Sequence, residues 1–177
     1  MEAEANTFAA NLLMPLDDFR VQVPASDSVD LDRLGACADR YGVSLVAAAL
    51  RWIEYTEKRA MLVLSRDDFV LWSRSSERAL RSNLFLKTIG RPPIDVPASS
   101  LAAMAPRDLG GCVAERHPEG VWFPEECQEW ILPSERYDFS ISLLLFSNTL
   151  PDWDTQQANR ARALGLNLPS SGISDLG

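Results

Sequence analysis

The opening segment of the chain is the most informative for chemistry, because it places Glu2 and Glu4 in the first turn of a helix. The apolar residues in this segment recur at steps of three and four, which predicts one helical face: Ala5, Phe8, Ala9, Leu12 and Leu13. A carboxylate here could bind a metal ion, but a catalytic zinc needs three protein ligands and an open position for water. One carboxylate cannot hold such an ion alone.

The second group of candidate residues is Cys112, His117 and Cys127. Their spacing fits no zinc-finger pattern, so we expect the cysteines to act as small buried apolar residues. His117 is the only histidine, it lies in a predicted Pro-Gly turn, and the sequence has no G-x-S-x-G motif. Because serine and cysteine hydrolases need a histidine base, neither class is supported. We therefore assign no catalytic and no cofactor-binding residue within this chain.

Composition and charge narrow the class of protein. The 177 residues are 46% hydrophobic and 24% charged, as in an ordinary globular protein. The net charge is −8, which argues against a nucleic-acid or membrane-surface binder, and only residues 41–100 are mildly basic. The acidic start is no secretory signal, and three widely spaced cysteines form no disulfide framework. We expect a cytoplasmic protein without a membrane segment.

A pair of helices is predicted next in the chain. Asp30 caps a helix that runs to Tyr41, and Ser44 caps a second helix that runs to about Tyr55. Two helices joined by a short turn with glycine look like a helix-turn-helix. The second helix offers only Arg51 and Glu54 for strong contacts to DNA, and Glu54 would repel phosphate. We therefore favour a packed helical hairpin, and DNA binding is not expected.

The remainder of the sequence predicts a sheet. A hairpin is expected from Ala60–Leu64 and Phe69–Ser73 with a four-residue loop, and the best strand is Tyr137–Phe146, whose alternating pattern indicates a half-buried strand. Further short strands and helices are expected at Gly111–Ala114, Val121–Phe123, Trp130–Leu132, Ser75–Ser82, Ser99–Met104 and 151–164. His117–Gly120 is expected to be a turn.

These elements predict an α+β fold, with N-terminal helices that include the helix-turn-helix-like hairpin, followed by a small, mostly antiparallel sheet domain. The expected boundaries are residues 1–57 for the helical region and 58–150 for the α+β domain. Residues 151–177 are expected to form a weak helix and a disordered tail. Trp72, Trp122 and Trp130 are expected to be core residues rather than the lining of a pocket.

The segment from Glu4 to Pro15, EANTFAANLLMP, resembles the helix that follows the zinc site in ImmA/IrrE-type metallo-endopeptidases, whose pattern is close to E-A-n-x-F-A-x-x-L-L-M-P. In that family an upstream helix supplies H-E-x-x-H, in which two histidines bind zinc and the glutamate is the general base. The resemblance implies that Glu4 is the third zinc ligand, with Glu2 as the fallback. This chain contains no H-E-x-x-H.

The resemblance extends with less specificity to the rest of the chain. Residues 34–52 are similar to the helical pair that follows the catalytic part in this family, and Met61–Ser76 is similar to the C-terminal region of many bacterial members. In some members the C-terminal domain looks like a small-ligand sensor of the GAF type. No motif here matches a binding residue of such a sensor.

The resemblance implies a truncated metallo-endopeptidase of a stress-response or repressor-cleaving regulator, which is inactive by itself. Zinc is expected in the intact family protein and not in this chain alone. The implied partner is a transcriptional repressor, and self-association through the exposed first helix is a further expectation. Two alternatives remain open: a non-catalytic regulatory module that binds a ligand or a protein, and a helix-turn-helix DNA-binding regulator that uses Asp30–Tyr55.

Overall fold

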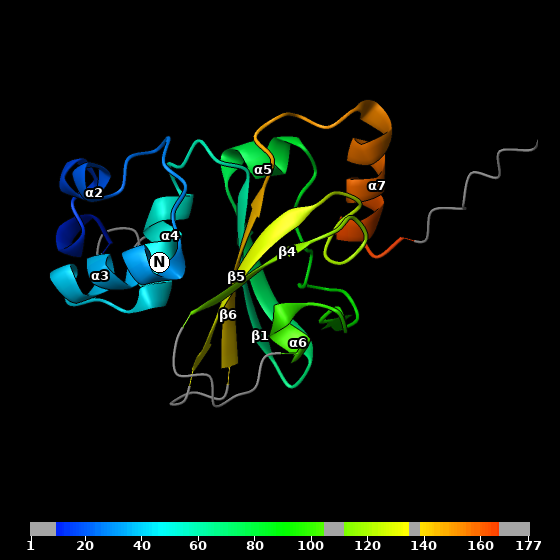
Figure 1. Ribbon diagram of the computed structural model, residues 1–177, viewed down its shortest axis with the longest axis horizontal. Helices are drawn as coiled ribbons and strands as arrows, with labels where there is room; N and C mark the ends of the chain where they lie inside the picture. Colours follow the sequence, from blue (N-terminus) through cyan, green and yellow to red (C-terminus); the bar gives the residue numbers. More distant parts are fainter. Residues whose placement is uncertain (1–9, 105–111, 135–138, 167–177) are drawn as a thin grey trace, which may run out of the picture.

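The computed structural model describes residues 10–104, 112–134 and 139–166. Within the described residues, helices precede a six-stranded sheet, so the predicted α+β fold is confirmed (Figure 1). The elements follow one another as α2 (Leu16–Gln22), α3 (Leu31–Tyr41), α4 (Leu45–Ile53), β1 (Ala60–Arg66), β2 (Phe69–Ser75), α5 (Glu77–Arg81), β3 (Ile94–Asp95), α6 (Leu101–Met104), β4 (Val113–His117), β5 (Cys127–Ser134), β6 (Phe139–Phe146) and α7 (Trp153–Ala163).

The helices begin and end where their capping residues predict. The Asp30 side chain accepts a hydrogen bond from the backbone N–H of Arg33, and Gly42 ends α3 with a left-handed φ of 63°. Ser44 caps α4 in the same way as Asp30 caps α3, through the backbone N–H of Ala47. Both predicted helices of the hairpin are therefore confirmed. A short helix, α2, follows Pro15.

The strands form one antiparallel sheet in the order β3-β2-β1-β6-β5-β4. The β1–β2 hairpin was expected to have a four-residue loop, but its turn contains only Asp67 and Asp68. Both have a positive φ, 51° and 65°, which is the backbone of a tight two-residue hairpin. The four-residue prediction failed because aspartates tolerate this conformation, which leaves Ser65 and Arg66 in the strand.

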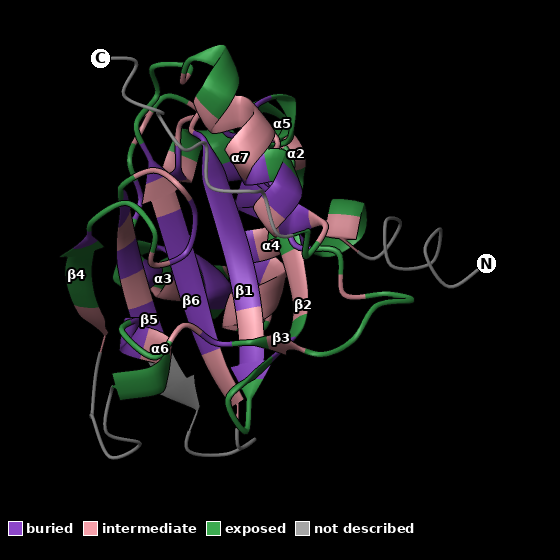
Figure 2. Cartoon of the chain, turned by 90° about the vertical axis from the view of Figure 1, so that its right-hand side faces the viewer, coloured by how far each residue is buried: buried purple, intermediate pink, exposed green. Residues whose placement is uncertain are grey.

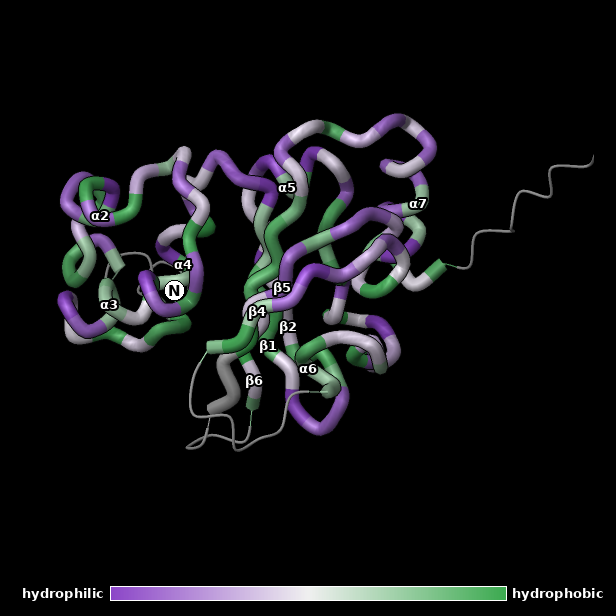
Figure 3. The backbone as a smooth tube through the Cα atoms, viewed as in Figure 1, coloured by the Kyte–Doolittle hydropathy of each residue, from purple (hydrophilic) through white to green (hydrophobic). Residues whose placement is uncertain are grey.

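The central strands are buried on both faces, which corrects the prediction that β6 is half buried. Residues 141–144 of β6 and residues 60–63 of β1 are all buried (Figure 2). One face of the sheet packs against α3 and α4, and the other packs against α5 and the loops around α6 and α7. Alternate side chains of β6 therefore enter two different cores, instead of one core and solvent. The hydrophobic segments of the chain come together in the sheet (Figure 3).

Two local predictions near His117 are wrong. Val121–Phe123 is not a strand but part of a loop with a single bridge between Phe123 and Glu125, and β4 pairs with β5 instead. His117 is the last residue of β4, opposite Cys127, and not part of the turn. The strand extends to His117 because its pairing with β5 outweighs the local turn preference of Pro118 and Gly120. Gly111, where this strand was predicted to begin, lies outside the described residues.

The predicted helix after residue 151 is confirmed as α7, which Asp152 caps through the backbone N–H of Thr155. Its end is attached to the loop beyond α5, because the backbone N–H of Lys87 donates to the carbonyl of Ala163. The short helices α5 and α6 also lie where the sequence placed them. The tail that was expected to be disordered falls from residue 167 onward outside the described residues.

Candidate functional site

The C-terminal end of the first helix is the part of the predicted zinc-ligand segment that the structure describes. Residues 10–13 are helical, and Met14 at their end is buried. Glu4, the predicted zinc ligand, and Glu2, its fallback, lie outside the described residues, so their roles stay predictions.

Arg51 of α4 holds the end of this helix. Its Nε and Nη2 donate to the carbonyl of Met14 at 3.1 and 2.9 Å, and Nη2 also donates to Oδ1 of Asn11 at 2.8 Å. Nη1 pairs with the Glu54 carboxylate at 2.9 Å. The Arg51 side chain is 5% exposed, so these bonds form away from water. A buried cation at a helix C-terminus also matches the negative end of the helix dipole.

An aromatic cluster extends this attachment to α2 and α3. The ring of Phe19 stacks on Tyr41 and meets Tyr55 edge-on, with centroid distances of 5.6 and 6.2 Å. The Tyr41 hydroxyl donates to the Asp18 carboxylate at 2.5 Å, and this bond is the main reason that the pKa of Asp18 lies below its usual value. The Tyr55 hydroxyl donates to the carbonyl of Val23. The helices thus form one packed unit around Phe19.

The apolar face of the first helix is only partly covered by this unit. Leu12 and Leu13 are 68% and 53% exposed. Ala5, Phe8 and Ala9, the other members of the predicted stripe, lie outside the described residues. Two exposed leucines next to the buried Met14 mark a surface at the start of the described chain that can accept another apolar surface.

The α3–α4 hairpin packs in a way that hides its second helix. The buried residues of α4 face the sheet: Ala48, Ala49, Arg51, Trp52 and Ile53. Arg51 was one of the two candidate DNA contacts in the sequence. Its guanidinium instead donates hydrogen bonds to Met14, Asn11 and Glu54. A DNA-reading helix must present polar side chains to base edges, so this packing supports the interpretation as a structural hairpin.

The second metal candidate, Cys112, His117 and Cys127, does not form a site in the structure. His117 is 2% exposed, and its Nε2 lies 2.8 Å from the Glu129 carboxylate. Burial raises the pKa of Cys127 to about 12 and that of Cys112 to about 11, so both are neutral thiols near pH 7. Over residues 10–104, 112–134 and 139–166, no three His, Cys, Asp or Glu side chains lie together as metal ligands. These residues therefore do not fit a zinc centre.

Glu129 is a buried carboxylate that sequence reasoning missed. It lies on β5, is fully buried, and accepts hydrogen bonds from five donors: His117 Nε2, Trp122 Nε1, Ser142 Oγ and the backbone N–H groups of Leu101 and Ala102. The donors come from separate loops and strands, so the carboxylate joins α6, β4, β5 and β6. No local signal marks it, because its neighbours in sequence are ordinary strand residues. With every oxygen occupied, it has the contacts of a structural residue.

Arg59 and Glu125 form a second buried polar cluster. The Arg59 guanidinium pairs with both oxygens of Glu125, at 2.9 and 2.7 Å, and also donates to Ser82 Oγ and to the carbonyls of Ser147 and Thr149. Asn159 of α7 donates to Glu125 at 2.8 Å. The cluster ties α7 to the start of β1 and to the end of α5. The Arg59 and Glu125 side chains have partners at every charged end, whereas the buried Oδ1 of Asn159 has none among the described residues. The contacts of Arg59 and Glu125 are those of structural residues.

Of the three tryptophans that were predicted to be core residues, Trp122 lies in a core, and Trp72 and Trp130 are partly buried against one. Trp122 is 1% exposed and belongs to the core on the α5 side of the sheet, whereas Trp72 and Trp130 pack against the core on the α4 side. No helix within the described residues is long and apolar enough to cross a membrane.

Comparison with known proteins bears on the first part of the chain. Residues 1–52 match the M78 peptidase family model, described as the IrrE N-terminal-like domain. A comparison with curated proteins finds no match. The matched range covers the first helix, α2, α3 and nearly all of α4, which is the unit that Arg51 and Phe19 hold together. The match confirms, over residues 1–52, the resemblance to ImmA/IrrE-type metallopeptidases that residues 4–15 indicate.

Proposed function

We propose that this chain is the ligand-bearing and scaffolding part of an ImmA/IrrE-type zinc endopeptidase. The family match over residues 1–52 carries the proposal. The attachment of the first helix by Arg51 adds a physical reason, since a helix that supplies a metal ligand has to be held in a fixed position. In this proposal Glu4 is the ligand, and Arg51 is a positioning residue that acts through the carbonyl of Met14.

The catalytic histidines have to come from a segment that is not among these 177 residues. The sequence contains only His117 and no H-E-x-x-H, and His117 is occupied by Glu129 in the core. The described residues do not fit a zinc centre, so no catalytic step is assigned to them. We infer that the chain by itself neither cleaves peptides nor holds zinc at full occupancy.

The biological role follows the same resemblance. We propose a cytoplasmic regulator in stress response, with a transcriptional repressor as the protein that it cleaves or controls. The acidic net charge and the buried face of α4 support a protein partner over DNA. The experiment is a cleavage assay with the repressor encoded nearest to this gene, and intact repressor in the presence of the zinc-loaded enzyme would contradict the proposal.

Zinc stoichiometry tests the assignment of Glu4. The protein is expressed together with an in-frame H-E-x-x-H segment from the coding sequence before Met1, and zinc is measured by elemental analysis. We expect about one zinc per chain, lost in Glu4→Gln and kept in Glu2→Gln, which is the matched control two residues away. Equal zinc in both variants would contradict the role of Glu4, and stoichiometric zinc in the 177-residue chain alone would contradict the scaffold proposal.

We also propose that the apolar stripe of the first helix mediates self-association when no other segment covers it. Leu12 and Leu13, which are more than half exposed, support this proposal. Full burial of each leucine is worth about 1.5–3 kcal/mol, which favours a covered state. Light scattering should show a dimer that Leu12→Glu dissociates, whereas Val21→Glu, at another exposed apolar residue, should leave it intact. A protein that stays monomeric at about 100 μM, a concentration at which a weak dimer should form, would contradict the proposal.

A further inference from the structure

Part of the outer edge of β2 has no strand beside it. β3 pairs only with Phe69 and Val70, at the start of β2. The rest of β2, up to Ser75, pairs with β1 on its inner side alone. Within the described residues, no hydrogen bond joins the backbone of residues 71–75 to a loop or a helix. An edge of this kind is a template for a further strand.

The register shows which backbone groups of β2 point outward. Ser76 N–H donates to the carbonyl of Ala60, so this pair is hydrogen-bonded across β1 and β2. In an antiparallel ladder such pairs alternate with non-hydrogen-bonded ones, whose N–H and C=O groups point away from the neighbouring strand. Ser75, opposite Met61, and Ser73, opposite Val63, are the non-hydrogen-bonded positions. Their backbone groups therefore face the open edge.

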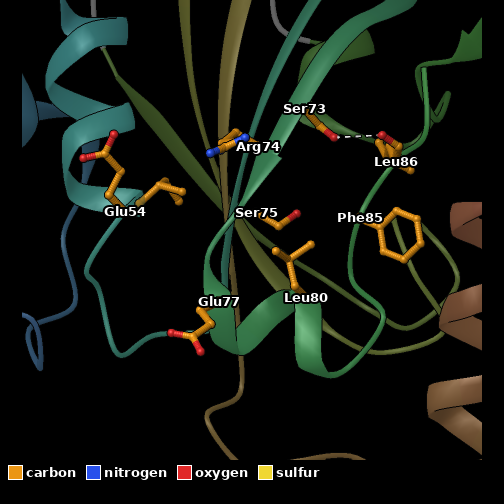
Figure 4. A pocket seen from close by; sticks show the side chains of 9 residues that line it. Glu54, Ser73, Arg74, Ser75, Glu77, Leu80, Phe85 and Leu86 are labelled. Atoms are coloured by element: carbon orange, nitrogen blue, oxygen red, sulfur yellow. Dashed lines mark hydrogen bonds between the residues drawn. The ribbon is translucent and has the colours of Figure 1, made fainter. Parts of the chain in front are cut away.

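A cavity lies along this stretch of edge. Its volume is about 390 Å³, and it is lined by residues of α4, β2, α5 and the loop after α5: Ile53, Glu54, Ser73, Arg74, Ser75, Glu77, Leu80, Phe85 and Leu86. The side chains lie on two sides of β2 (Figure 4). Arg74 points toward α4, whereas the Ser75 hydroxyl points to the opposite side, toward Phe85. The Ser73 hydroxyl points to that same side and donates to the carbonyl of Leu86 at 3.2 Å. A strand laid along the edge would meet both sides with alternate residues.

Two polar groups in this cavity lack partners. Ser75 is 8% exposed, and its Oγ has no hydrogen-bond partner among the described residues. Arg74 is exposed and has no ion pair or hydrogen bond of its side chain within the same part of the chain. The two carboxylates of the lining are already paired, Glu54 with Arg51 and Glu77 with Arg81. The charge that remains open in the cavity is therefore positive.

We propose that β2 binds an extended peptide segment of a partner protein as an additional antiparallel strand. The partner residue opposite Ser75 is a serine or threonine, which satisfies the buried Oγ. The next residue is an aspartate or glutamate opposite Arg74, and the third, opposite Ser73, is apolar and lies against Leu80 and Phe85. The proposal does not depend on the proposed zinc ligand or on peptidase function.

The probe is the blocked peptide acetyl-Ser-Val-Thr-Asp-Leu-Thr-Ser-amide with a fluorophore, titrated with the full chain by anisotropy. In an antiparallel pair the threonine and the leucine exchange hydrogen bonds with Ser75 and Ser73, and the aspartate does not. N-methylation of the leucine should therefore weaken binding about tenfold or more, and N-methylation of the aspartate should change it less than about threefold. This comparison leaves the protein unchanged, so misfolding cannot cause the difference.

Variants of the protein test the charge contact. Arg74→Glu should weaken binding of the aspartate peptide about tenfold. The same variant should bind a peptide with lysine in place of the aspartate more tightly than the wild-type protein does. Arg116→Glu, at an exposed residue of β4 on the opposite edge, is the matched control and should change neither. Ser73→Pro removes an edge N–H and should abolish binding, with circular dichroism to confirm the fold.

Several outcomes would overturn the proposal. These are the absence of saturable binding at about 1 mM peptide, equal effects of the two N-methylations, and binding that Arg74→Glu leaves unchanged. If the protein forms a dimer and Ser73→Pro dissociates it, the occupant of the edge is a second copy of this chain. The chain itself carries the pattern once, as Ser174-Asp175-Leu176. Tighter peptide binding in Asp175→Lys would show that this segment, rather than a partner protein, is the occupant.

Discussion

Replacing Arg51 by alanine should destabilise the protein strongly and release the first helix. The guanidinium donates two hydrogen bonds to the carbonyl of Met14 and one to Asn11, and its side chain is 5% exposed. Alanine leaves a buried carbonyl without these donors and removes the packed stem of the arginine, which together cost about 2–4 kcal/mol of unfolding free energy. For a chain of this length, that corresponds to a fall in Tm of about 4–16 °C.

The assay combines urea unfolding with hydrogen exchange of residues 10–16. Glu54→Gln is the matched control, because it removes only the half-exposed partner of the same arginine and should cost less than about 1 kcal/mol. In Arg51→Ala the amide of Met14, which bonds to the carbonyl of Ala10, should lose protection more than the amides of α3 do. A change within about 0.5 kcal/mol of wild type, or unchanged protection at Met14, would refute the positioning role of Arg51.

Three further predictions concern the rest of the molecule. Glu129→Gln places an amide N–H₂ group among the donors that surround the fully buried carboxylate. The free energy of unfolding in urea should fall by about 3–5 kcal/mol, and a fall of less than about 1 kcal/mol would contradict the structural role of Glu129. Cys127, whose pKa burial raises to about 12, should react with a disulfide reagent at pH 8 only as fast as the protein unfolds, and rapid labelling of the native protein would contradict its burial. Because the bond from Tyr41 lowers the pKa of Asp18 below 3.8, this contact should stabilise the fold above about pH 4 and be lost as the pH falls through the lowered pKa. Tyr41→Phe should remove that part of the acid dependence, and an identical acid profile would contradict it.

Local signals in the sequence determined the helices and the approximate positions of most strands. A cap acts on backbone groups within one turn, so Asp30, Gly42 and Ser44 predict where α3 and α4 begin and end. The pattern at residues 4–15 indicated the family for the same reason, since it lies within one helix. The alternation in β6 predicted a strand but not its surroundings, because a pattern of period two does not say whether its second face meets solvent or another core.

Only the tertiary structure decided which residues carry the polar contacts. Arg51 donates to Met14 and Asn11, which lie 37 and 40 positions earlier in the chain. Arg59, just before β1, pairs with Glu125, which lies 66 positions later. His117 was assigned to a turn, yet it becomes buried because β4 pairs with β5 and brings it to Glu129. The open edge of β2 depends on β3 covering only two residues of it. These features arise from pairing between distant segments, where the gain comes from burial and hydrogen bonds that no local pattern encodes.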